Sequence, residues 1–303
     1  MKISQKKSGV ALTYATQIIN IATKLVYTPV MLSIVGQSEY GLYQIADSII
    51  SYLALINLGV TGAYARYYTV AQEKDERSVK EVNGTFLTVL LLMSAVCVIA
   101  GLVLVWNVEA LFGTGLTVDE YALSRKLMLV LIINMAITFP AGLFEHNITV
   151  NERFFTIKLI NLLKTLLNPF IALPLLLLGH GAVSLVVTTT ILTISATVIE
   201  MFYCITKLKM RFIISFKSFG MLKSIGKFTL FIFINQIIEL INWNVDKILI
   251  ARYMGSAAVA VYSVGSQIRS MFSSFPNAIR TVFQPRMYKM VAANESDERI
   301  SAF

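Results

Sequence analysis

Polar side chains recur at helical spacing inside two otherwise apolar stretches of the sequence. In the stretches 10–35 and 225–251 they stand three or four residues apart, which places each series on one face of an α-helix. Such a face is expected either where a helix lines a wet cleft or where its side chains hydrogen-bond to neighbouring helices. The two series are Thr13, Gln17, Asn20, Lys24 and Thr28, and Asn235, Glu239, Asn242 and Asp246.

Two cations within apolar stretches are candidates for binding an anionic cargo. Lys24 is the first, because a compact ammonium group suits a phosphate that must bind and then leave. Arg269 is the second, since a guanidinium group can donate two hydrogen bonds to a phosphate or carboxylate. The alternatives are ion pairs, of Lys24 with Asp47 and of Arg269 with Glu239 or Asp246. The predicted cavity-lining set is Lys24, Arg269, Gln17, Asn20, Asn242, Asp246 and Arg66.

Three carboxylic acids could couple transport to H⁺ or Na⁺. Asp47, Glu145 and Glu239 lie in or near apolar stretches, and protonation of a desolvated carboxyl group can drive a conformational change. For Glu145 the alternative is a plain position at the end of its helix. We expect no metal and no cofactor. The phosphate-binding pattern GxxxxGK[ST] does not occur in the sequence, so nucleotide hydrolysis is not the expected energy source.

The elements that must position these residues are transmembrane helices. Of the 303 residues 56% are hydrophobic and only 14% charged, with a mean hydropathy of +0.70, which is typical of a chain dissolved in a bilayer. The apolar stretches predict an all-α integral membrane protein of about eight spans. These are 10–35, 41–64, 84–107, 127–149, 156–179, 181–206, 225–251 and 257–283.

The distribution of lysine and arginine predicts the orientation. With a cytoplasmic N-terminus, eight spans put both termini inside and leave only Arg125, Lys126 and Arg252 for the opposite loops. This asymmetry follows the positive-inside rule, which also explains the net charge of +9 without nucleic-acid binding. Arg66, at the cytoplasmic end of the second span, fits the same rule, and guiding an anionic headgroup is its alternative role.

An internal repeat divides the chain into two unequal parts. A shift of 219 residues, which corresponds to six spans, superimposes similar residues without a gap and indicates a parallel repeat. We therefore expect a six-helix N-terminal lobe (1–206), a cytoplasmic interfacial linker (207–224) and the first two helices and tail of an incomplete second lobe (225–303). The matches include segment 17–21 with 236–240, Gly36 with Gly255 and Tyr43 with Tyr262.

Two longer segments carry a family resemblance. LVYTPVMLSIVGQSEYGLYQIADSI, followed by INLGVTGAYARYY, resembles the N-terminal lobe of oligosaccharide flippases in the multidrug/oligosaccharidyl-lipid/polysaccharide (MOP) exporter superfamily. NWNVDKILIARYMGSAAVAVYSVGSQI is similar to the opening of that family's second lobe. The resemblance implies twelve to fourteen helices in two lobes around a central cavity, with an undecaprenyl-diphosphate-linked saccharide as cargo.

These observations predict a flippase in the bacterial inner membrane that moves an anionic lipid-linked oligosaccharide from the cytoplasmic to the outer leaflet. Its partners would be the bilayer, H⁺ or Na⁺, and proteins of polysaccharide assembly. A cation-coupled multidrug exporter of the same fold is one alternative. A membrane-embedded transferase or polymerase acting on lipid-linked sugars is another, although Asp119 and Glu120 are the only paired carboxylates in the short external loops.

Overall fold

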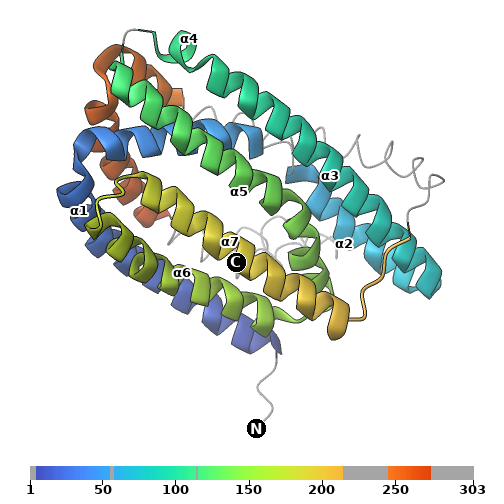
Figure 1. Ribbon diagram of the computed structural model, residues 1–303. Helices are drawn as coiled ribbons and strands as arrows, with labels where there is room; N and C mark the ends of the chain where they lie inside the picture. The colour runs from blue at the N-terminus through green and yellow to red at the C-terminus, as the bar shows by residue number, and fades with distance from the viewer. Residues whose placement is uncertain (1–4, 55–57, 114, 214–244, 274–303) are drawn as a thin grey trace, which may run out of the picture. The chain divides into compact units, whose positions relative to one another are not determined.

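The chain is a nearly all-helical, multi-pass membrane protein. The computed structural model describes residues 5–54, 58–113, 115–213 and 245–273, and these contain helices and turns but no strand. Five of their helices are long and apolar enough to cross a membrane. The labelled helices (Figure 1) are α1 (Gln5–Ala54), α2 (Leu58–Gln72), α3 (Glu76–Trp106), α4 (Val108–Phe112), α5 (Val118–Val150), α6 (Phe154–Leu177) and α7 (Val183–Thr206).

Two further helical stretches, 245–254 and 256–273, carry no label in the figure. The chain divides into two compact units, Met1–Ala260 and Val261–Phe303. In the second unit the described residues, 261–273, are helical, and they are considered by themselves. The predicted spans 225–251 and 257–283 lie partly outside the described residues.

Four predicted spans correspond to single helices: 84–107 to α3, 127–149 to α5, 156–179 to α6 and 181–206 to α7. The first predicted span, 10–35, and the start of the second, 41–64, correspond to two helical segments that share the label α1, and the end of the second span lies in α2. The two segments meet at a kink at Gly36, where φ is 82° and ψ is 166°, so no separate loop lies between them. A side chain would be strained in this conformation, whereas glycine adopts it readily.

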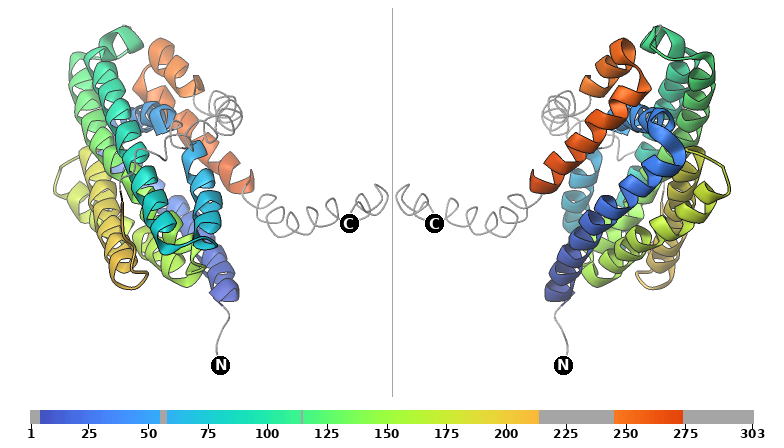
Figure 2. Two further views of the ribbon diagram at one scale, coloured as in Figure 1. Left: turned by 90° about the vertical axis from the view of Figure 1, so that its right-hand side faces the viewer. Right: turned by 90° about the vertical axis from the view of Figure 1, so that its left-hand side faces the viewer.

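Within residues 1–260, α5 is the central helix. It packs against α3 on one side and α7 on the other, and α6 packs against both α7 and α1 (Figure 1). The two side views show α3 and α5 running alongside each other (Figure 2). The helix interfaces bury two apolar clusters, one around Ile45, Met128 and Phe139 and the other around Phe86 and Leu143.

A buried series of hydrogen bonds joins α5, α2 and α3. Asn147 donates through Nδ2 to the hydroxyl of Tyr64 at 2.7 Å, and that hydroxyl donates to Oδ1 of Asn83 at 2.8 Å. All three residues are almost fully buried. Asn83 also donates through Nδ2 to the carbonyl oxygen of Arg211 at 3.1 Å. Each of these three buried side chains therefore finds a partner, which is what a low-dielectric interior requires.

The stretch 207–213, which leaves α7, is strapped to α3. The backbone N–H of Ile213 donates to the carbonyl oxygen of Lys80 at 2.9 Å. Met210 is buried, and the ring of Phe212 meets that of Phe144 edge to face at 6.4 Å. A Cβ at Gly84 would lie 2.2 Å from the carbonyl oxygen of Ile213, so only glycine permits this approach. We call residues 207–213 the strap; the rest of the predicted linker, 214–224, lies outside the described residues.

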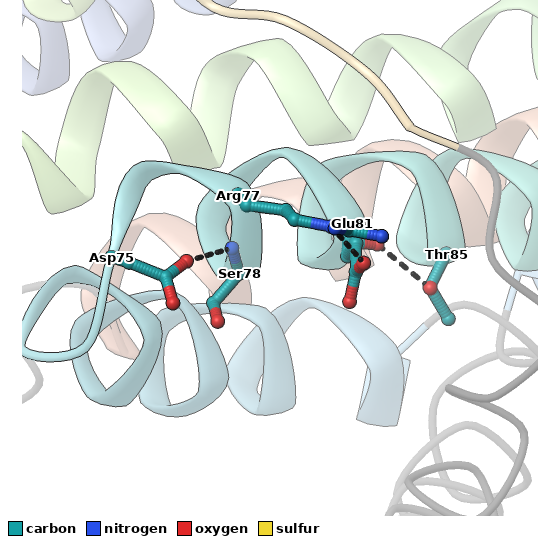
Figure 3. Close-up of polar contacts among 5 residues, drawn as sticks. All are labelled: Asp75, Arg77, Ser78, Glu81 and Thr85. Atoms are coloured by element: carbon teal, nitrogen blue, oxygen red, sulfur yellow. Dashed lines mark hydrogen bonds and ion pairs between the residues drawn. The ribbon is translucent and has the colours of Figure 1, made fainter.

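α3 begins with a well-defined cap (Figure 3). Oδ1 of Asp75 accepts a hydrogen bond from the backbone N–H of Ser78 at 2.6 Å, and this bond lowers the pKa of the Asp75 carboxyl group. One turn later Arg77 pairs with Glu81 at 3.2 Å, and the hydroxyl of Thr85 donates to the carbonyl oxygen of Glu81. The start of α3 is thus set by local contacts.

Candidate functional site

Lys247, in the helix 245–254, is tied to α1 by a hydrogen bond and a charge interaction. Its Nζ donates to Oε1 of Gln44 at 3.3 Å, across a sequence separation of 203 residues. Its ammonium group also interacts electrostatically with the carboxylate of Asp47. Gln44 donates in turn to the hydroxyl of Tyr40 at 2.9 Å. The predicted coupling residue Asp47 is therefore brought beside a cation that the sequence analysis did not choose.

A second predicted residue, Asp246, lies on the same helix. It is exposed, and its charge interacts with the hydroxyl of Tyr52 on α1. Asp47 and Asp246 thus both lie where α1 faces the helix 245–254. The seam between α1 and the helix 245–254 therefore contains one half-buried cation, Lys247, and two exposed carboxylates that can attract cations of their own.

The predicted polar face of α1 lies on one continuous helix. Gln17 is exposed and Asn20 is half-buried, whereas Thr28 is buried and hydrogen-bonds to Tyr40. Lys24 is a helical residue of α1, but its side chain is outside the described part of the structure. That this face lines a cavity stays a prediction.

A charged cluster lies between α5, α6 and α7. Nζ of Lys164 on α6 donates to Oγ1 of Thr193 on α7 at 2.8 Å. The ammonium group also interacts electrostatically with the carboxylates of Glu200 and Glu145. Glu200 is only 6% exposed, so its charge depends on this neighbour. We call Glu145, Lys164, Thr193 and Glu200 the Lys164 cluster.

Glu145 is a predicted coupling residue, whereas Lys164 and Glu200 are not among the predicted site residues. The available signal was the presence of opposite charges, Lys164 and Glu200, within two successive apolar spans, 156–179 and 181–206. Sequence spacing alone could not pair them, because the pairing depends on how α6 and α7 are rotated about their axes.

The remaining predicted residues lie elsewhere or outside the described part of the structure. Arg66 is exposed on α2, and Arg269 is exposed on the helix of the second unit. Asn242 and Glu239 fall outside the described residues. Over the described ranges, no three His, Cys, Asp or Glu side chains gather in a way that could hold a metal ion.

Glu120, at the start of α5, makes a third set of contacts. Its Oε1 accepts hydrogen bonds from the hydroxyls of Ser38 on α1 and Ser256 in the helix 256–273. The two hydroxyl oxygens are 3.1 Å apart. Its Oε2 accepts the backbone N–H of Thr117 at 2.8 Å, as the capping box of α5 requires. Nearby, Oε2 of Glu39 accepts the backbone N–H of Ala182 at 2.9 Å.

Two concavities lie elsewhere on the described part of the protein, one beside the strap and one between α1 and α6. One, of about 830 Å³, lies beside the strap and is lined by charges of both signs, including Asp75, Lys80 and Arg211. The other, of about 550 Å³, runs between α1 and α6 and is almost wholly apolar, with Val26 and Phe170 among its lining residues. The second could accommodate a hydrocarbon chain but offers few polar groups to fix one.

The sequence pattern of a family described as "polysaccharide biosynthesis protein" matches residues 7–291 of the chain. No curated protein sequence matches.

Several solved structures have a similar fold. The MATE multidrug transporter DinF-BH superimposes with a TM-score of 0.71 and 16% identity, over 92% of this chain and 64% of that one. A MOP superfamily transporter from Pyrococcus furiosus superimposes with a TM-score of 0.62 and 16% identity, over 89% of this chain and 61% of that one. The lipid II flippase MurJ, in an inward closed conformation, superimposes with a TM-score of 0.61 and 18% identity, over 84% of this chain and 54% of that one. The chain therefore spans less than two thirds of the length of these neighbours.

Proposed function

Since the chain belongs to the polysaccharide biosynthesis protein family, we propose that it flips a lipid-linked oligosaccharide from the cytoplasmic to the outer leaflet. The observation that carries the proposal is the family match, which covers residues 7–291. The cargo we propose is an undecaprenyl-diphosphate-linked repeat unit of a surface polysaccharide. The membrane would be the bacterial inner membrane, with both termini on the cytoplasmic side.

The cargo site we propose combines the polar face of α1 with the opening helix of the second lobe. Lys24 would contact the diphosphate, with Gln17, Asn20, Asn242 and Asp246 lining the cavity and Arg269 and Arg66 as further cations. The contact of Lys247 with Gln44 supports this arrangement, because it brings the helix 245–254 against α1. The lipid tail would stay in the bilayer while the headgroup passes.

Coupling to H⁺ or Na⁺ would use carboxylates that lie close to a cation. Asp47 beside Lys247, and Glu145 beside Lys164, meet this condition. Binding a proton or Na⁺ at such a carboxylate would release its lysine and so favour a different packing of the helices. Glu239 remains a third candidate.

A cation-coupled multidrug exporter is the second candidate function. The fold similarity to a MATE multidrug transporter favours it. In that case the cargo is cationic, and the carboxylates Asp47 and Asp246 would matter more than Lys24. The transferase alternative is disfavoured by the contacts of Glu120, whose carboxylate accepts three hydrogen bonds from the protein itself.

Complementation tests the proposal. The wild-type protein, expressed from its natural reading frame, is introduced into a bacterial strain whose own polysaccharide flippase has been deleted. Lys24→Ala and the matched surface variant Lys74→Ala are tested in the same strain. We expect surface polysaccharide to return with the wild type and with Lys74→Ala, but not with Lys24→Ala at equal membrane levels.

If the wild-type protein reaches the membrane yet lipid-linked oligosaccharide still accumulates inside, flipping of that saccharide is refuted. Efflux of a cationic dye that depends on Asp47 would then favour the multidrug exporter.

A further inference from the structure

We propose that Ser38, Glu120 and Ser256 form a latch that holds one end of the transport pathway closed and must open in every transport cycle. The inference rests on the proposed function, because a latch has meaning only in a chain that transports. On the predicted topology the loop before α5 faces outward, so opening the latch would connect the pathway with the outer side.

The latch is built on a single carboxylate oxygen. Oε1 of Glu120 accepts hydrogen bonds from the hydroxyls of Ser38 and Ser256, which come from sequence positions 218 residues apart. Hydrogen bonds to an ionised carboxylate are about twice as strong as those between neutral groups. One side chain therefore joins three elements: α5, α1 and the start of the helix 256–273.

Around the latch, the backbone at Gly41 and Gly115 lies directly against the backbone of the stretch 251–256. A Cβ at Gly41 would lie 1.9 Å from the carbonyl oxygen of Ser256, and one at Gly115 would lie 2.4 Å from that of Ala251. Neither position tolerates a side chain. Phe112 and Leu116, on either side of Gly115, are buried in the same apolar cluster as Ala251. The backbones are therefore in close contact around the latch.

Each latch serine lies next to a backbone kink. Ser256 directly follows Gly255, and Ser38 is the second residue after Gly36; both glycines have φ angles near 80°. A glycine in this region is free of the Cβ strain that fixes other residues, so the helix can change direction there. The latch thus lies where a small change in two kinks would separate its three elements.

Glu120 has a separable second role in the capping box of α5. Glutamine at this position preserves a capping box, because its side chain can still accept the backbone N–H of Thr117. That single amide oxygen is then used by Thr117, so an uncharged NH2 group faces the two serines and the two hydrogen bonds to an ionised carboxylate oxygen are lost. Glu120→Gln therefore weakens the latch and keeps the helix start, whereas Thr117→Ala weakens the helix start and leaves the serine contacts.

The first experiment locks the latch. Ser38→Cys/Ser256→Cys should form a disulfide on mild oxidation in membranes, since the two hydroxyl oxygens are only 3.1 Å apart. Formation of the disulfide should abolish delivery of surface polysaccharide, and a reductant should restore it. The single-cysteine variants are the controls, and Cys97 and Cys204 are buried. Failure to cross-link, or full delivery by the cross-linked protein, would overturn the latch.

The second experiment needs no cargo. Ala251→Cys, at a buried position in the same close contact whose side chain makes no latch hydrogen bond, is labelled from outside with a membrane-impermeant maleimide in the wild-type, Glu120→Gln and Thr117→Ala backgrounds. We expect labelling on the order of tenfold faster with Glu120→Gln, because its weaker hydrogen bonds let the latch open more often, and no change with Thr117→Ala. Equal rates in all three would refute the latch. Because labelling is read without any saccharide, a failure of complementation would count against the proposed function and not against the latch.

Discussion

Gly36 and Gly255, which are 219 residues apart, have nearly the same positive φ angle, 82° and 84°. The sequence repeat pairs these two glycines, and each interrupts a helical stretch. Since few residues other than glycine adopt positive φ, this shared angle is a strong constraint on both positions. It agrees with an origin of the two segments by duplication.

Replacing Gly36 should destabilise the protein through backbone strain alone. A Cβ at this position would meet nothing within 4 Å, but the φ and ψ angles of 82° and 166° lie in a region open almost only to glycine. We expect Gly36→Ala to cost about 1–3 kcal/mol, measured as a lower melting temperature in detergent.

Gly265→Ala is the matched control for Gly36→Ala. It also lies in open space, in a helix and without a positive φ angle, and should be neutral or slightly stabilising. Equal melting temperatures for the two variants would contradict the strain argument.

Removal of the Asn83 side chain should release the strap. Asn83→Ala leaves the hydroxyl of Tyr64 and the carbonyl oxygen of Arg211 without this partner, at a cost of about 1–3 kcal/mol. We expect trypsin to cut after Lys209 or Arg211, which are exposed, several-fold faster than in the wild type. Asn107→Ala is the control, since the Asn107 side chain donates only to its own helix. Unchanged cleavage by trypsin would mean that apolar contacts alone hold the strap.

The Lys164 cluster should behave as a coupled group. Lys164→Met leaves the buried Glu200 carboxylate without its cation, and Glu200→Gln removes a counter-charge from Lys164. Each single variant should lower the melting temperature. The double variant should lose less than the sum of both, with a coupling energy of about 0.5–3 kcal/mol. Strictly additive losses would show that the charges do not stabilise each other.

Asp75 should make the stability of α3 depend on pH in the acid range. The hydrogen bond from the Ser78 N–H lowers the pKa of Asp75 in the folded protein, so the carboxylate stabilises the fold fully above its ordinary pKa of about 3.9. The stabilisation is lost as the pH falls through the lowered folded-state value. Asp75→Asn keeps an N-cap acceptor that does not titrate.

The difference in melting temperature between the wild type and Asp75→Asn should therefore be constant from about pH 5 to about pH 7 and shrink below about pH 4. Other carboxylates titrate equally in both proteins and cancel. A difference in melting temperature that stays constant down to about pH 3 would exclude a contribution from the Asp75 charge.

Hydropathy predicted α3, α5, α6 and α7 because each contains an uninterrupted apolar stretch. It placed the start of α5 at residue 127, whereas the helix begins at Val118. The charged residues of the first turns carry no hydropathy signal, although the capping box formed by Thr117 and Glu120 is a start signal that could have been used. That the two segments of α1 would join at one kinked residue, Gly36, could not be predicted, since a glycine fits a kink as well as a loop.

The candidate site was predicted as a set of residues and not as a set of contacts. Asp47, Glu145 and Asp246 were recognisable because ionisable groups are costly in a bilayer. Their neighbours Lys247 and Lys164 come from other helices, and sequence spacing contains no information on how two helices are rotated against each other. The contacts of Glu120 with two serines were hidden for the same reason.

The strap shortens the tether between the two halves of the repeat. Seven residues, 207–213, follow α7 but are bound to α3, so they add nothing to the reach of the chain that continues from residue 214. At about 3.3–3.6 Å per extended residue, this removes roughly 23–25 Å of slack. A shorter tether raises the effective concentration of each connected half near the other. Loosening the strap would therefore give the second half more room to move without altering any contact at the seam.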